Sequence, residues 1–275
     1  MTHQATNELG NPRQSIHTFI ISWSEKHDNA ARIVKAVAPS SDAVTVVYSD
    51  SNDDFNPNFT CATIKRPNDL FFGDKFRACI ESCKTDILLA IHADCDCEDW
   101  SKVVRHCRRA FEQIPQIGVW APLINYTYWS LDRTEIKRIS NSPFTIVAQS
   151  NAIVVGLTRP ILNRMRKANY DRNIYGWGID FMFNYCAYSI GMISVVDTSI
   201  FVQHPKTTEY PKEIAAAEQV EFLKQLTPIE RSQSLLLDTI VRLRAVAGGR
   251  GPAVRLSQRG DWNLEMIRSV SSVEP

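Results

Sequence analysis

Short hydrophobic runs alternate with longer segments of helical spacing along the first half of the chain. The runs 17–23, 43–48 and 86–92 are rich in β-branched and aliphatic residues, which is typical of buried strands. Shorter runs at 60–64 and 118–122 predict two more strands. Strands that are apolar on both faces belong to sheets covered on both sides. We therefore expect an α/β domain with a mostly parallel mixed sheet and helices on both faces.

Three segments between these runs have the apolar spacing of amphipathic helices, at 28–37, 71–83 and 99–114. Asp28 is a candidate N-cap for the first of them. Helices of this length provide the crossover connections that neighbouring parallel strands require. The first half of the chain thus predicts a doubly wound, Rossmann-like arrangement.

The alternation stops after residue 122. Residues 123–142 mix aromatic, charged and polar side chains without a period, and such irregular segments often carry function. The remaining predicted elements are a long strand at 144–155, a short helix at 160–167, a strand at 193–202 and helices at 213–225 and 228–246. A glycine-rich break and a basic tail follow.

Composition narrows the partners only slightly. Of the 275 residues, 44% are hydrophobic, which is enough for a sizeable core, and the formal charge of +1 does not indicate a nucleic-acid partner. The first thirty residues lack the pattern of a signal peptide, and no apolar run approaches the length of a membrane span, so we expect a cytoplasmic protein. The seven cysteines show no paired C-x-x-C spacing and are interpreted as reduced thiols.

Polar side chains stand where three predicted strands end: Ser22 and Trp23, Asp50, and the cluster His92-Ala93-Asp94-Cys95-Asp96. In doubly wound sheets, ligands bind beyond the carboxyl ends of the strands. The glycine-rich loops of dinucleotide-binding and P-loop proteins are missing, so a bound diphosphate would need another counter-charge. Carboxylates of Asp94 and Asp96 could hold Mn²⁺ or Mg²⁺ for that purpose, although a D-x-D pattern is also common in solvated loops.

A second candidate site is the segment Tyr175-Gly176-Trp177-Gly178-Ile179-Asp180. Its two glycines let the backbone approach a ligand closely, and the Trp177 indole offers a flat face for a sugar ring. Asp180 could be a helix N-cap or a general base that deprotonates an acceptor hydroxyl. Farther along, His204 directly follows the strand at 193–202 and is a candidate imidazole ligand for a metal that carboxylates already hold.

The order of these features resembles that of GT-A glycosyltransferases, particularly the inverting family 2 type, over about residues 15–206. The resemblance implies a single GT-A domain in which Ser22, Trp23 and Asp50 bind the nucleoside of the donor. It further implies that Asp94, Asp96 and His204 bind the metal, that Tyr175, Trp177 and Gly178 contact the acceptor, and that Asp180 is the catalytic base.

One departure from the family pattern leaves two alignments open. Family 2 sequences often read Leu-Asp-Ala-Asp-Cys where this chain has Ile91-His92-Ala93-Asp94-Cys95. In that alignment His92 replaces the first aspartate and approaches the donor, and Asp96 has no metal role. Asp94 is a metal ligand in both alignments.

The resemblance implies metal-dependent, inverting transfer of a sugar from a nucleotide-diphosphate sugar such as a UDP-sugar to a hydroxyl of a glycan or lipid-linked glycan. The domain would divide into a leader (1–14), a donor half (15–122), an acceptor half (123–210) and a C-terminal helical extension (211–275). Two alternatives stay open, an inactive glycan-binding or assembly protein and a sugar-nucleotide nucleotidyltransferase. The latter needs a glycine-rich, arginine-bearing loop after the first strand, where this chain reads SWSEKHDN.

The extension has three interpretations: it packs on the domain, forms a homodimer surface, or rests on the inner face of a membrane. The last would use Arg242, Arg244, Arg250 and Arg255. Packing is the interpretation that we adopt.

Overall fold

The computed structural model describes residues 13–52, 54–206 and 211–247. The strands are β1 (Ile16–Ser22), β2 (Ala43–Tyr48), β3 (Ala62–Lys65), β4 (Ile87–His92), β5 (Ile117–Ile124), β6 (Glu135–Arg138), β7 (Phe144–Val147), β8 (Val154–Thr158) and β9 (Ile193–Val202). The helices are α1 (His27–Val37), the 3₁₀ turn η1 (Ala38–Ser40), α2 (Phe72–Ser82), α3 (Trp100–Gln113), α4 (Leu131–Thr134), α5 (Arg159–Met165), α6 (Ile179–Ser189), α7 (Lys212–Leu223) and α8 (Pro228–Ala247).

All of these strands join one nine-stranded sheet in the order β3-β2-β1-β4-β8-β5-β9-β7-β6. Strands β1 to β4 pair in parallel, as do β5 and β9, while β8 and β7 are antiparallel to their neighbours. The sheet is therefore mixed, and only β7 and β8 oppose the common direction. The carboxyl ends of β1, β2, β4 and β9 consequently lie along the same edge of the sheet.

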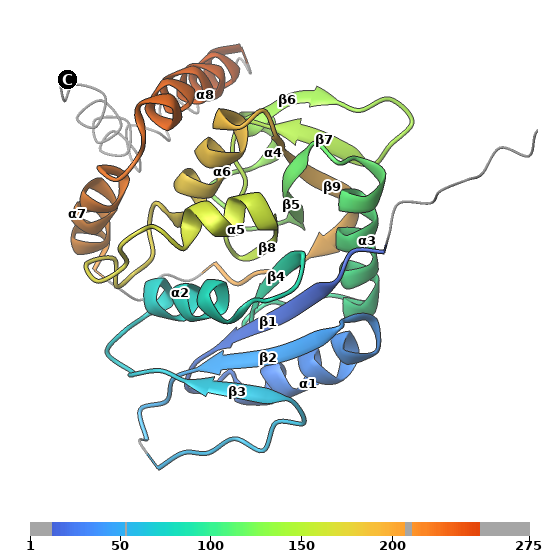
Figure 1. Cartoon of the computed structure of the whole chain (residues 1–275), viewed down its shortest axis with the longest axis vertical. Helices are drawn as coiled ribbons and strands as arrows, with labels where there is room; N and C mark the ends of the chain where they lie inside the picture. The colour runs from blue at the N-terminus through green and yellow to red at the C-terminus, as the bar shows by residue number, and fades with distance from the viewer. Residues whose placement is uncertain (1–12, 53, 207–210, 248–275) are drawn as a thin grey trace, which may run out of the picture.

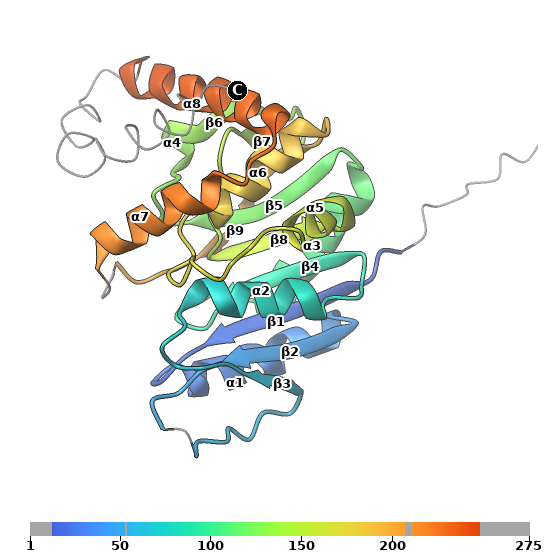
Figure 2. The same ribbon diagram turned by 60° about the vertical axis from the view of Figure 1, so that its left-hand side comes forward.

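Helices cover both faces of this sheet, as Figures 1 and 2 show, with α1 and α3 on one face and α2, α5 and α6 on the other. Each face has its own hydrophobic cluster. Successive residues of β1 point to opposite clusters, with Phe19 and Ile21 in one and Ile20 in the other. The predicted α/β class with two covered faces is confirmed.

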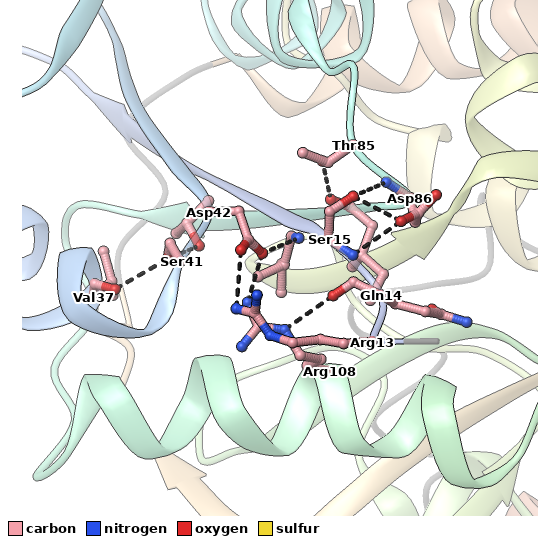
Figure 3. Close-up of polar contacts among 12 residues, drawn as sticks. Arg13, Gln14, Ser15, Val37, Ser41, Asp42, Thr85, Asp86 and Arg108 are labelled. Carbon is pink, nitrogen blue, oxygen red and sulfur yellow. Dashed lines mark hydrogen bonds and ion pairs between the residues drawn. The ribbon is translucent and has the colours of Figure 1, made fainter. Parts of the chain in front are cut away.

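Two carboxylates fix the start of the fold (Figure 3). Asp42 accepts a hydrogen bond from the backbone N–H of Ile16 at 2.8 Å and pairs with Arg108 at 2.7 Å. Asp86 accepts hydrogen bonds from the backbone N–H and the hydroxyl of Ser15, at 2.9 and 2.7 Å. Strand β1 thus begins at Ile16, one residue before the predicted strand at 17–23, and residues 1–12 of the predicted leader lie outside the described residues.

The predicted single strand at 144–155 is wrong, because the structure has two strands, β7 and β8, in different places in the sheet. Strand β7 pairs with β9, and β8 lies between β4 and β5. Asn151 accounts for the break, since its side-chain oxygen accepts hydrogen bonds from the backbone N–H groups of Ile153 and Val154, which turns the chain. The pattern of apolar residues cannot reveal a turn that a single amide side chain stabilises.

The predicted N-cap at Asp28 is also wrong. Helix α1 begins at His27 with Lys26 in the N-cap position, and Asp28 lies in the first turn. There its negative charge still complements the helix dipole.

Helices α7 and α8 pack on the domain (Figure 1). Phe222, Leu223 and Leu237 belong to the same hydrophobic cluster as α6, and a buried Glu230 pairs with Arg164 of α5 at 2.7 Å. No helix in the described part of the chain is long and apolar enough to cross a bilayer. Arg250 and Arg255 of the basic tail lie outside the described residues.

Candidate metal centre and base

A short antiparallel bridge joins the segments that follow β4 and β9. The backbone of Asp96 donates to the carbonyl of Gln203 at 2.9 Å, and the backbone of Gln203 donates to the carbonyl of Asp96 at 2.8 Å. Two residues before Asp96 comes Asp94, and one residue after Gln203 comes His204. The bridge therefore places Asp94 beside His204 although the two are far apart in sequence.

His92, Asp94 and His204 form a group whose potential ligand atoms all lie within 4.8 Å of one another. His204 Nε2 is 3.5 Å from the Asp94 carboxylate. The buried His92 Nε2 and His204 Nδ1 have no hydrogen-bond partner within the described ranges. Buried polar atoms without partners are uncommon, and they fit a site that completes its contacts by binding a ligand.

The protonation states in this group suit a cation. Burial lowers the pKa of His92 to about 4, so its imidazole is neutral at pH 7 and keeps a lone pair for coordination. Burial alone would raise the pKa of Asp94, but the interaction with His204 and the charges of the two imidazoles outweigh it and lower that pKa. The imidazole nitrogens of His92 and His204 beside the Asp94 carboxylate make a mixed nitrogen and oxygen donor set.

Aromatic rings hold the His92 side chain in place. The Phe72 ring lies 4.7 Å from the imidazole between centroids, and the Trp23 ring meets it edge-on at 6.1 Å. Trp23, a predicted donor-binding residue, therefore lies directly beside the candidate metal-binding group.

Asp96 lies apart from this group. Its carboxylate accepts a hydrogen bond from Arg32 at 2.6 Å, and its side chain is 60% exposed. The structure therefore brings His92 together with Asp94 and His204, and it leaves the second aspartate of the D-x-D pattern outside. Asp94 lies in a turn after β4, in which the backbone N–H of Cys95 donates to the carbonyl of His92 at 3.2 Å, whereas Asp96 lies in the bridge and its carboxylate contacts Arg32 of α1.

Ser22 and Asp50 are linked through a histidine that the sequence analysis did not single out. His27 Nδ1 lies 2.9 Å from the Ser22 hydroxyl, and its Nε2 lies 2.9 Å from the Asp50 carboxylate. The backbone N–H of Asn52 and then His27 lower the pKa of Asp50 against the effect of burial. Ser22 is fully buried, so this array organises the ends of β1 and β2 and does not present a nucleophile.

The segment from Tyr175 to Gly178 is a tight loop with two left-handed glycines. Gly176 has φ 76° and Gly178 has φ 89°, values that favour glycine strongly. A Cβ at position 176 would overlap the Phe72 ring, so the loop packs against the same ring that contacts His92. From the other side, Glu218 of α7 accepts a hydrogen bond from the backbone N–H of Tyr175 at 3.0 Å.

Asp180 follows in the first turn of α6, whose N-cap is Gly178, so Asp180 is not the cap. Its Oδ2 accepts a hydrogen bond from the Trp129 indole at 2.6 Å, and its Oδ1 accepts one from the backbone N–H of Phe181 at 2.9 Å. Burial nevertheless raises the pKa of Asp180 to about 6. A carboxylate with a pKa close to neutral is suited to take a proton from a substrate.

The overall fold is similar to that of solved structures, and this similarity identifies the fold type. A crystal structure of GalNAc-T7 with UDP, GalNAc and Mn²⁺ matches 95% of this chain and 56% of its own chain, with 10% identity and a TM-score of 0.61. The chain has a GT-A fold. It spans little more than half the length of that GalNAc-T7 chain.

Two further structures match with lower TM-scores. A mycobacterial protein matches 76% of this GT-A chain and 73% of its own, with 11% identity and a TM-score of 0.52. The mannosyltransferase PcManGT from Pyrobaculum calidifontis, in complex with GDP-Man and Mn²⁺, matches 94% and 85% with 11% identity and a TM-score of 0.45. No protein-family model and no curated protein matches the sequence.

Sequence reasoning missed three residues that shape this candidate site: His27, Phe72 and Trp129. Each acts through a contact with a distant segment, so local spacing carries no signal for it. For Trp129 a weaker signal existed, because the aromatic stretch Asn125–Ser130 follows a predicted strand end and has no helical or strand period.

One cavity of about 510 Å³ lies away from these residues, lined by Arg13, Arg108, Glu112 and Gln113. Both arginines are engaged by Asp42, as Figure 3 shows. These contacts anchor the amino end of β1. The cavity lining contains none of the candidate site residues.

Proposed function

We propose that this chain is a metal-dependent glycosyltransferase that moves a sugar from a nucleotide-diphosphate sugar to a hydroxyl of a glycan acceptor with inversion. The observation that carries the proposal is the meeting of His92, Asp94 and His204 at the edge where the strands end. The GT-A fold supports it, and the neighbour GalNAc-T7 is described with UDP, GalNAc and Mn²⁺.

His92, Asp94 and His204 would hold the metal, with His92 in the place that the D-x-D pattern gave to Asp96. Three protein ligands leave coordination positions open for diphosphate oxygens. Two imidazole nitrogens favour Mn²⁺ over Mg²⁺, which prefers oxygen ligands. When bound, the ion would offset the negative charge that develops on the departing nucleoside diphosphate.

Trp23 and the Ser22-His27-Asp50 array would receive the nucleoside of the donor. The array lies at the ends of β1 and β2, and Trp23 lies beside His92, so the nucleoside and the diphosphate would bind next to each other along one edge. Asp50 retains free lone pairs beyond its contacts with His27 and Asn52 and could accept a hydrogen bond from the base.

Tyr175, Trp177 and Gly178 would form the acceptor side, with Asp180 as the general base. The Tyr175 ring lies 5.0 Å from the ring of Phe71, which is 43% exposed and offers a face for a sugar ring. Asp180 would take the proton from the acceptor hydroxyl while the hydroxyl oxygen attacks the anomeric carbon and the nucleoside diphosphate leaves. A single displacement of this kind inverts the anomeric configuration.

The test is a thermal-shift screen of UDP- and GDP-sugars with and without Mn²⁺, followed by measurement of nucleoside-diphosphate release with simple sugar acceptors. We expect one donor class to raise the melting temperature only when Mn²⁺ is present, and Asp94→Ala to lose that effect. Stabilisation by a donor without any nucleotide release would instead identify a glycan-binding protein with a transferase fold. Release of pyrophosphate from a nucleoside triphosphate and a sugar phosphate would identify a nucleotidyltransferase.

A further inference from the structure

The aromatic segment Asn125–Ser130 touches both parts of the candidate site. At its start, the Asn125 side-chain oxygen accepts hydrogen bonds at 2.9 Å from the backbone N–H groups of His204 and of Tyr126. Near its end, Trp129 donates to Asp180. One short segment after β5 therefore contacts the backbone of a candidate metal ligand and the carboxylate of the candidate base.

The Trp129 indole has a fixed orientation. It is 9% exposed, and the rings of Tyr128 and Phe181 meet it edge-on, with centroids 4.6 and 5.0 Å away. The backbone N–H of Trp129 also donates to the Thr127 hydroxyl at 3.2 Å. Because the indole cannot rotate without losing these contacts, its N–H points at one place, the Oδ2 of Asp180.

An indole N–H is a donor only, so it cannot compete for the proton that a base must accept. A hydrogen bond to the charged form of a carboxylate favours that form. At Asp180 it opposes the effect of burial, which favours the neutral acid. Oδ1 and Oδ2 each have one fixed donor, from Phe181 and Trp129, and each keeps lone pairs for a substrate hydroxyl.

We propose that Trp129 is a positioning residue for Asp180, which fixes the direction of its carboxylate and holds it in the charged, proton-accepting form. The inference rests on the proposed base function of Asp180. Asn125, at the other end of the segment, keeps this arrangement in register with His204.

Other ionisable groups around Asp180 belong to the helices packed there. Tyr185 of α6 is buried, and the charges of Asp238 and Asp180 both raise its pKa further. Asp238 of α8 pairs with Arg242. From α4, the Arg133 guanidinium lies over the Tyr128 ring of the segment, 4.9 Å from its centroid.

Trp129→Phe removes the N–H and keeps an aromatic ring in the same packing. We expect the acidic limb of its kcat profile to move up by about one pH unit, since a lost charge-assisted hydrogen bond has roughly that effect on a carboxylate. From that shift the variant should lose roughly fivefold at pH 6 and almost nothing at pH 8. The matched control is Trp100→Phe, because the Trp100 indole N–H is buried without a hydrogen-bond partner in the described structure. It should leave the profile in place.

A second measurement does not depend on turnover. The indole ¹H–¹⁵N resonance of Trp129, assigned by its absence in Trp129→Phe, should titrate with a midpoint near the pKa of about 6 of Asp180 and should stop titrating in Asp180→Asn. An indole signal that does not titrate, or an unmoved kinetic profile in Trp129→Phe, would overturn the positioning role. Full transfer activity in Asp180→Asn would overturn the base itself, and the indole titration would then report a structural contact alone.

Discussion

The two parts of the candidate site are built in different ways. His92, Asp94 and His204 stand at strand ends, where the backbone ladder and the bridge between Asp96 and Gln203 fix their places. Asp180 owes its environment to individual side chains, chiefly Trp129 from a segment with no regular structure. A site that depends on backbone pairing tolerates changes in neighbouring side chains, whereas one that depends on single contacts does not.

The largest expected effect is the loss of transfer activity when Asp180, whose environment is set by single side chains, is replaced. Asp180→Asn keeps an acceptor for the Trp129 indole and removes the base, so transfer should fall by about 10²- to 10⁴-fold. Donor binding in the presence of Mn²⁺, measured by calorimetry, should stay within a few-fold of the original. Near-normal turnover would contradict the role of Asp180.

Gly176→Ala should lower the stability by roughly 2 to 4 kcal/mol, because it adds a left-handed alanine and an overlap with Phe72. Gly191→Ala is the matched control. Gly191 has φ 75° and no heavy atom near its would-be Cβ, so it isolates the backbone cost of about 1 to 2 kcal/mol. Denaturant midpoints give both values. Equal losses would mean that Phe72 moves aside and does not couple the loop to His92.

At the strand ends, the two aspartates of the D-x-D pattern should differ in their effect on Mn²⁺ affinity. Asp94→Asn should weaken Mn²⁺ binding by at least about 100-fold, as expected for a lost ligand, while Asp96→Asn should change it by less than about twofold. Asp96 is matched in chemistry and lies two residues away, with an exposed carboxylate on Arg32. Calorimetric titration with Mn²⁺ decides the point. Equal weakening would return Asp96 to the ligand set.

The smallest effect concerns stability and pH. The pKa of Asp180 is raised to about 6 in the folded chain, so the folded state keeps a proton that the unfolded state releases at lower pH. Its contribution to stability is therefore present below about pH 4 and is lost as the pH rises to about 6. Asp180→Asn should remove that loss and be more stable by about 1 to 2 kcal/mol at pH 8, with no gain at pH 4. Urea unfolding at both values, compared between the two proteins, measures the difference. A variant that is less stable at pH 8 would contradict the assigned shift.

The contrast also explains what the sequence could predict. Buried strands and amphipathic helices have periodic patterns, so α3 and the C-terminal helices lie within a residue or two of their predicted limits. The positions of the strand ends follow from the strands, and this made Asp94 and His204 candidates, which the structure places side by side. The break between β7 and β8 depends on the Asn151 side chain, and the choice of His92 over Asp96 depends on a bridge between distant segments. Neither interaction leaves a periodic trace in the sequence.

The bridge between residues 96 and 203 uses only backbone atoms, so it accepts any residue except proline at either position. Proteins with this fold could exchange both residues and still keep the position of the candidate metal-binding group. Sequence identity could then decline while the bridge is retained. The fold match to GalNAc-T7 at 10% identity over 95% of this chain shows how far sequences can diverge within one fold. Searches for relatives of this protein should therefore give the pairing of the segments after β4 and β9 more weight than the exact residues of the acidic motif.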